Sequence, residues 1–190
     1  ADPRIDHSAS LIEVIHEIDS QTEAMAGGAG TVRGSGGMAS KLAAAKIASW
    51  SGVSTVIANA AREGVVADAA AGVAGVGTSV PARESRLAAR KLWIAFAVVA
   101  QGRVVVDPGA RRALESGKSL LAAGVRDVDG AFDPGAPVDV VDTDGSVFAK
   151  GLARHGSDEI GRVAGQRSDA LPAGAPAVVI HADDLVTIPA

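Results

Sequence analysis

The stretch that decides the fold is GSGGMASKLAAAKIASWSGVSTVIA, residues 34–58, in which a glycine-rich segment runs into a helical pattern and then into a β-branched one. Residues 38–50 are dense in strong helix formers, and Gly52 stands where a glycine commonly ends a helix. Residues 53–58 form an unbroken run rich in β-branched residues, which is typical of a strand buried on both faces of a parallel sheet. A helix followed at once by such a strand predicts an α/β fold.

The segments on either side of this stretch predict smaller elements. In residues 11–18, side chains alternate at the two-residue period of a strand, but the apolar positions also fit the period of a helix. We favour the strand. Ser20 and Glu23 have the spacing of a capping box, which predicts a short helix with Ser20 as its cap. Residues 62–82 are rich in glycine, which indicates an irregular loop with at most one short helix. Residues 83–100 begin with a basic cluster and end as a buried apolar element. We interpret the cluster, which consists of Arg83, Arg86, Arg90 and Lys91, as a solvated or interdomain face, with RNA contact as the lesser alternative.

The second half of the chain predicts short strands. Val104 to Val106 form a strand, and a helix follows in which Asp107 is the cap and Pro108 the first residue. Residues 138–152 contain an Asp-Gly turn between two apolar runs, which predicts a hairpin, and residues 177–188 predict a second one. Strands of this length and spacing are typical of a small, mostly-β barrel or sandwich.

Composition and charge narrow the class of protein. The chain has 190 residues, 47% of them hydrophobic, and no cysteine, so we expect a globular protein of the cytoplasm without disulfides or thiolate metal sites. The longest uncharged stretch, residues 69–82, is too short to span a membrane, and residues 1–6 lack the features of a signal peptide. The formal net charge of −4 falls in residues 101–190, which disfavours general nucleic-acid binding.

The segment Gly34 to Lys41 is the candidate anion site, because glycines there let backbone N–H groups approach phosphate oxygens at the start of a helix. Lys41 would add positive charge in the first turn. The Walker A pattern fails because the residue directly before Lys41 is not a glycine. Gly34, Gly36 and Ala39 have the spacing of the Rossmann pattern, but no apolar strand leads into them. On spacing alone, glycines that only form a tight turn would explain the segment equally well.

The sequence resembles the glutamate 5-kinases of the amino-acid kinase family. Residues 34–48 and 55–59 resemble their nucleotide-phosphate loop, helix and strand. Four further stretches resemble the end of the kinase domain and the PUA domain that follows it, a combination we know from no other amino-acid kinase: residues 90–94, 105–110, 117–125 and 179–186. The resemblance implies the C-terminal part of a parallel-sheet kinase sandwich at residues 1–100, and a mostly-β, PUA-like barrel at residues 101–190.

The resemblance also implies a reaction and its residues. The activity would be ATP-dependent phosphorylation of L-glutamate to L-glutamyl 5-phosphate, the first step of proline biosynthesis, with Mg²⁺ bound to the nucleotide and a homo-oligomer as the assembly. Lys41 would be catalytic by stabilising the transferred phosphoryl group. The ATP phosphates would be held by seven consecutive residues: Ser35, Gly36, Gly37, Met38, Ala39, Ser40 and Lys41. No residue is assigned to a metal, since the four histidines share no ligand spacing.

Two departures from the family limit this reading. The family's first half, with the residues that grip glutamate, would lie before Ala1, so we expect an N-terminally truncated chain that lacks the glutamate site. Ala60 stands where the family usually has a glycine beside the nucleotide loop. The alternative is an inactive fragment in which the PUA-like part serves as an RNA-binding or regulatory module.

Overall fold

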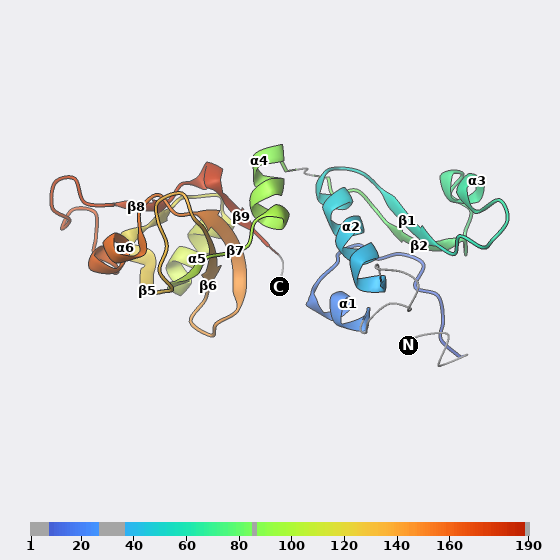
Figure 1. The fold of residues 1–190 in the computed structure, drawn as a ribbon, viewed down its shortest axis with the longest axis horizontal. Helices are drawn as coiled ribbons and strands as arrows, with labels where there is room; N and C mark the ends of the chain where they lie inside the picture. Colours follow the sequence, from blue (N-terminus) through green and yellow to red (C-terminus); the bar gives the residue numbers. More distant parts are fainter. Residues whose placement is uncertain (1–7, 27–36, 85–86, 189–190) are drawn as a thin grey trace. The chain divides into compact units, whose positions relative to one another are not determined.

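A computed structural model describes residues 8–26, 37–84 and 87–188, and it divides the chain into two compact units (Figure 1). Unit 1 ends at Leu87 and unit 2 begins at Ala88, whereas the sequence placed the domain boundary at residues 100 and 101. Within the described ranges, no helix is long and apolar enough to cross a membrane.

Unit 1 is a small α/β unit. Helix α2 lies against a two-stranded antiparallel sheet, β1–β2, in which Thr55 pairs with Val80 and Ala58 with Gly77. Leu42 and Ala45 of α2 are buried with Ile18 and Val80. The elements in chain order are α1 (Ser20–Met25), α2 (Met38–Trp50), β1 (Thr55–Ala58), α3 (Val65–Ala70) and β2 (Gly77–Val80).

The structure confirms α2 and corrects three predictions in unit 1. The strand at 53–58 exists as β1, but its partner is antiparallel and Val56 is 39% exposed, so it is not buried on both faces. The predicted loop at 62–82 contains a strand, β2, as well as a short helix. The predicted strand at 11–18 is reduced to one parallel bridge between Val14 and Ser79.

The short helix predicted at this position exists as α1, but its predicted cap, Ser20, is wrong. The cap is Asp19, whose carboxylate accepts hydrogen bonds from both the backbone N–H and the hydroxyl of Thr22, each at 2.8 Å. These two hydrogen bonds hold the pKa of the Asp19 carboxyl below its usual range. Ser20 is therefore the first helical residue and not the cap.

Unit 2 is built on a five-stranded sheet with the order β5-β3-β6-β7-β9, and a separate pair, β4–β8, packs with it. Side chains from the strands and from helices α5 and α6 form one core, which includes Val104, Leu114 and Ile160. The strands are β3 (Gly102–Val106), β4 (Leu120–Leu121), β5 (Val125–Asp129), β6 (Pro137–Val141), β7 (Val147–Leu152), β8 (Val178–Ile180) and β9 (Leu185–Thr187). The helices are α4 (Ala89–Leu92), the π-helical η1 (Trp93–Ala97), α5 (Pro108–Glu115), α6 (Ser157–Val163), and the 3₁₀ turns η2 (Ala122–Gly124) and η3 (Ala182–Asp184).

Most predictions for unit 2 are confirmed. Asp107 caps α5 by accepting from the N–H of Ala110 at 2.8 Å, with Pro108 in the first position. Strands β6 and β7 form the predicted antiparallel hairpin. The last predicted hairpin is wrong, because β8 pairs with β4 and β9 pairs with β7.

The segment α4–η1 belongs to unit 2, where it packs on β7 and β9. Ile94 is fully buried, and Ala95 is 6% exposed. The Arg90 side chain pairs with Asp184 at 2.7 Å, and the Lys91 ammonium donates to the carbonyl of Ala182 at 3.0 Å. These contacts explain why the compact unit begins before β3.

Candidate nucleotide-binding site

The described part of the candidate site is the start of α2. Gly37 is the N-cap, in an extended conformation (φ −72°, ψ −172°), and no side chain caps the helix among the described residues. The Ser40 hydroxyl donates to the Gly37 carbonyl at 2.8 Å, and the Lys41 N–H donates to the same oxygen at 3.4 Å. Ser35 and Gly36, which the sequence also assigns to the site, lie outside the described residues.

Exposure and charge make this helix end accessible to an anion. Gly37 is half-buried, while Met38, Ala39, Ser40 and Lys41 are exposed. The first turn of α2 carries no acidic residue, so no carboxylate of this turn opposes the partial positive charge of the helix N-terminus. The backbone N–H groups of a first turn have no acceptor within the helix and are suited to phosphate oxygens. The structure therefore brings Gly37, the three N–H groups that follow it and Lys41 to one helix end.

The other end of α2 is fixed within unit 1. The Ser49 hydroxyl donates to the Pro81 carbonyl at 2.7 Å, and the N–H groups of Arg83 and Leu87 donate to the last carbonyls of the helix, those of Ser49 and Trp50. The Arg83 guanidinium lies 4.3 Å from the centre of the Trp50 ring and 2.8 Å from the Glu17 carboxylate. These contacts anchor the C-terminal end of α2 within unit 1.

Sequence reasoning missed the role of Arg83, which it placed in a basic cluster with Arg86, Arg90 and Lys91 on a solvated or interdomain face. Arg83, Arg90 and Lys91 are each engaged with neighbouring groups of their own unit, and Arg86 lies outside the described residues. No short-range pattern connects Arg83 to Trp50, because the contact depends on the folded path between them. Within the described ranges, no group of three or more His, Asp or Glu residues could hold a metal ion.

Comparison with known proteins identifies the two classes to which these units are related. A family model described as the PUA domain matches residues 102–174, so unit 2 contains a PUA domain. A solved PUA domain structure from Aeropyrum pernix K1 is 26% identical and covers 48% of this chain and 49% of its own, with a TM-score of 0.35. Curated relatives match over both units, and their shared name is that of a kinase that acts on an amino acid.

These relatives are glutamate 5-kinases. The protein of Pelobacter propionicus is 44% identical over 193 residues, which is 99% of this chain and 52% of the relative. The protein of Caulobacter vibrioides is 45% identical over 190 residues, which is 97% of this chain and 50% of the relative. The chain spans about half the length of the curated relatives it matches. The resemblance is thereby confirmed: the chain is similar to the C-terminal half of glutamate 5-kinases, the end of the kinase domain followed by the PUA domain.

Proposed function

We propose that this chain provides the ATP-binding part of a glutamate 5-kinase, which transfers the γ-phosphoryl group of ATP to the γ-carboxylate of L-glutamate and forms ADP and L-glutamyl 5-phosphate. The observation that carries the proposal is the uncapped, exposed start of α2 with a lysine in its first turn. The similarity to glutamate 5-kinases along 99% of the chain supports it. Glycines that only form a tight turn would explain the glycine-rich segment, but not an exposed, uncapped helix start that also carries a lysine.

The roles of the residues follow from the charge of the ligand. The N–H groups of Met38, Ala39 and Ser40 would donate to phosphate oxygens, and the Lys41 ammonium would stabilise the charge on the transferred phosphoryl group. Ser35 and Gly36 would complete the loop. Mg²⁺ would arrive with ATP and neutralise further phosphate charge, since phosphoryl transfer is catalysed mainly by positioning and electrostatics.

The proposal for this chain is limited to the nucleotide. By the resemblance, the residues that hold L-glutamate belong to the half of the relatives that this chain does not span. Phosphoryl transfer would therefore require that half, and nucleotide binding is the property that the chain itself can be tested for.

The test is calorimetric titration of the 190-residue chain with Mg²⁺-ATP. We expect Lys41→Ala to raise the Kd about tenfold or more, because a hydrogen bond to a charged group contributes roughly 1.5–3 kcal/mol. Lys118→Ala is the matched control, since Lys118 is an exposed lysine of unit 2, and it should leave the Kd unchanged. Equal affinity of the Lys41→Ala chain and the unchanged chain would contradict the assignment.

The PUA domain supports a second candidate function, contact with RNA, in which unit 2 acts as an adaptor. The excess of four acidic side chains in residues 101–190 weighs against broad phosphate contact and ranks this candidate behind the kinase. If unit 2 binds RNA through phosphates, its affinity should fall steeply as the salt concentration rises. Negligible RNA binding at low salt would remove this candidate.

A further inference from the structure

Strand β1 of unit 1 has an edge to which no strand is paired in the part of the chain that the structure describes, because β1 and β2 form a sheet of only two strands. Strand β2, in contrast, has both edges in use. Ser79 of β2 donates its N–H to the Glu13 carbonyl at 2.8 Å and accepts from the Ile15 N–H at 2.9 Å, on the side away from β1. The sheet of unit 1 therefore ends at β1 on one side.

The direction of these hydrogen bonds shows which groups of β1 face the open edge. In an antiparallel pair of strands, opposite residues alternate between pairs that exchange hydrogen bonds and pairs that do not. Ser79 lies opposite Val56 and bonds away from β1, so these two residues exchange no hydrogen bond. The same holds two residues along, for Ala58 and Gly77. The N–H and C=O groups of Val56 and Ala58 therefore point to the open edge, while those of Ile57 face β2.

One face of the same sheet is also uncovered. Side chains alternate between the two faces along a strand, so Ile57 and Val80, which pack with α2, share the covered face. Val14 is 46% exposed and Val56 is 39% exposed on the opposite face. The residues of that face carry no charge, and none of them is buried: Val14, Val56, Ala58, Gly77 and Ser79. A sheet face of this kind is normally packed against another layer of structure.

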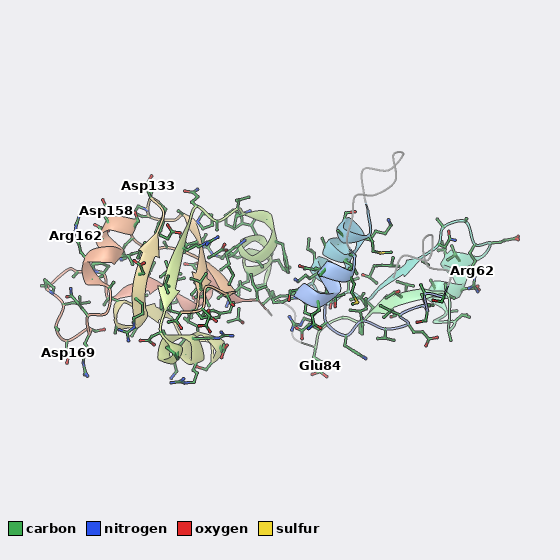
Figure 2. The ribbon with its side chains drawn as sticks, turned by 90° about the horizontal axis from the view of Figure 1, so that it is seen from below. Arg62, Glu84, Asp133, Asp158, Arg162 and Asp169 are labelled. Carbon is green, nitrogen blue, oxygen red and sulfur yellow. The ribbon has the colours of Figure 1, made fainter. Side chains whose placement is uncertain are left out.

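No feature of β1 itself protects the open edge. Exposed edges of native sheets commonly carry a charged residue, a proline or a β-bulge. The β1 sequence Thr-Val-Ile-Ala has neither a charge nor a proline, and its pairing with β2 shows no register shift. Helix α3 lies at one end of the strands, where Arg62 pairs with Asp68 at 3.0 Å (Figure 2). The edge therefore has the properties of one that is paired within a larger sheet.

We propose that the open edge of β1 and the face around Val14 and Val56 bind the half of a glutamate 5-kinase that this chain does not span, with an extended segment of that half paired to Val56 and Ala58. The relative from Pelobacter propionicus matches 99% of this chain but only 52% of its own length, so about half of it remains to supply that segment. Main-chain hydrogen bonds would hold the added strand, and the exposed valines would give it apolar contact. The identity of the partner rests on the proposed kinase function, whereas the open edge does not.

The test is hydrogen exchange of backbone amides, followed by NMR in the 190-residue chain and in a longer chain in which the N-terminal half of the Pelobacter propionicus relative is joined before Ala1. In the 190-residue chain, the amides of Val56 and Ala58 should exchange quickly, because they have no partner strand. In the joined chain they should exchange about a hundredfold more slowly or less. The Ile57 amide is the internal control, because it faces β2 and should be protected in both chains. No nucleotide is added, so failure of ATP binding at α2 would leave this result unchanged.

Two substitutions of exposed valines in the joined chain test the contact itself. Val56→Lys places a charge in the proposed contact, where its burial is costly, so the Ala58 amide should exchange about tenfold faster or more while the Ile57 amide stays protected. Val66→Lys is the matched control, since Val66 lies on α3 and is 81% exposed, and it should change neither amide. Equal exchange of Val56 and Ala58 in the 190-residue chain and the joined chain would overturn the proposal. Protection in the 190-residue chain that rises with protein concentration would also overturn it, because a second copy would then occupy the edge.

Discussion

Truncation of Ile94 to alanine tests whether the α4–η1 segment is a structural part of unit 2. Ile94 is fully buried and lies in η1, the element that contacts β7 and β9. Removal of a buried isoleucine side chain to alanine costs about 2–5 kcal/mol, because the lost burial and the remaining cavity both destabilise the fold. A domain of this size has a total stability of roughly 5–15 kcal/mol, so the loss is a large fraction of it.

The assay is differential scanning calorimetry of the whole chain, in which the transition of unit 2 is followed. One kcal/mol shifts the melting temperature of a domain of this size by about 4–8 °C, so Ile94→Ala should lower it by about 8 °C or more. Trp93 lies in unit 2 and Trp50 in unit 1, so their fluorescence helps to assign the two transitions.

Val99→Ala is the matched control for this prediction, because Val99 follows η1 and is 85% exposed. A surface substitution of this kind usually changes stability by less than about 0.5 kcal/mol. The transition of unit 1 should be unchanged in both variants, since distant sites contribute independently. If Ile94→Ala behaved like Val99→Ala, the segment would not be packed on unit 2 and the boundary at Leu87 and Ala88 would be wrong.

Three further substitutions test local features of the two units. Asp19→Ala removes the cap of α1. Because hydrogen bonds from Thr22 lower the pKa of the Asp19 carboxyl, the cap should stabilise the fold above the ordinary carboxyl pKa and should lose this effect as the pH falls through the lowered pKa. The denaturation midpoints of the Asp19→Ala chain and the unchanged chain should therefore converge in strong acid. Gly77→Ala should destabilise unit 1 by about 1–3 kcal/mol, because a Cβ at this position would collide with the Ile57 carbonyl. The measurement is urea denaturation, and an unchanged midpoint of unfolding would refute the β1–β2 register. Gly161→Ala should instead stabilise unit 2 by up to about 1 kcal/mol, since the methyl group meets open space in a helix, and a lower midpoint would contradict that geometry.

The elements that could be predicted are those specified by neighbouring residues. Helix α2 follows from a run of helix formers that ends near Gly52, which has a φ of 80°. The start of α5 follows from the pair Asp107 and Pro108, and the β6–β7 hairpin follows from a turn in which Gly145 has a φ of 83°. In each case the signal lies within a few residues of the feature that it specifies.

The elements that were missed depend on distant partners. Strand β2 is short and only its last residue is fully buried; it exists because β1 pairs with one edge and the segment around Val14 bridges to the other. The predicted hairpin at 177–188 has two suitable strands, but η3 separates them and each finds a partner elsewhere. Neither pairing leaves a signal in the local sequence.

The candidate site was predicted in part for the same reason. The glycine segment and Lys41 are adjacent in sequence, and the structure places Gly37 to Lys41 at one exposed helix end. The groups that hold the far end of α2, Arg83 and Glu17, are separated from it along the chain, and sequence reasoning assigned Arg83 to a solvated or interdomain face. Short-range spacing therefore suggested the candidate anion site, which stays a prediction, but it gave no sign of the contacts at the far end of α2.

We propose that ATP phosphates bind at the start of α2, and NMR of the ¹⁵N-labelled chain tests this claim most directly. During titration with Mg²⁺-ATP, the largest changes in backbone amide shifts should fall on residues 37–41 and should saturate with the Kd measured by calorimetry. ATP binding that shifts amides elsewhere and leaves residues 37–41 unchanged would contradict the claim.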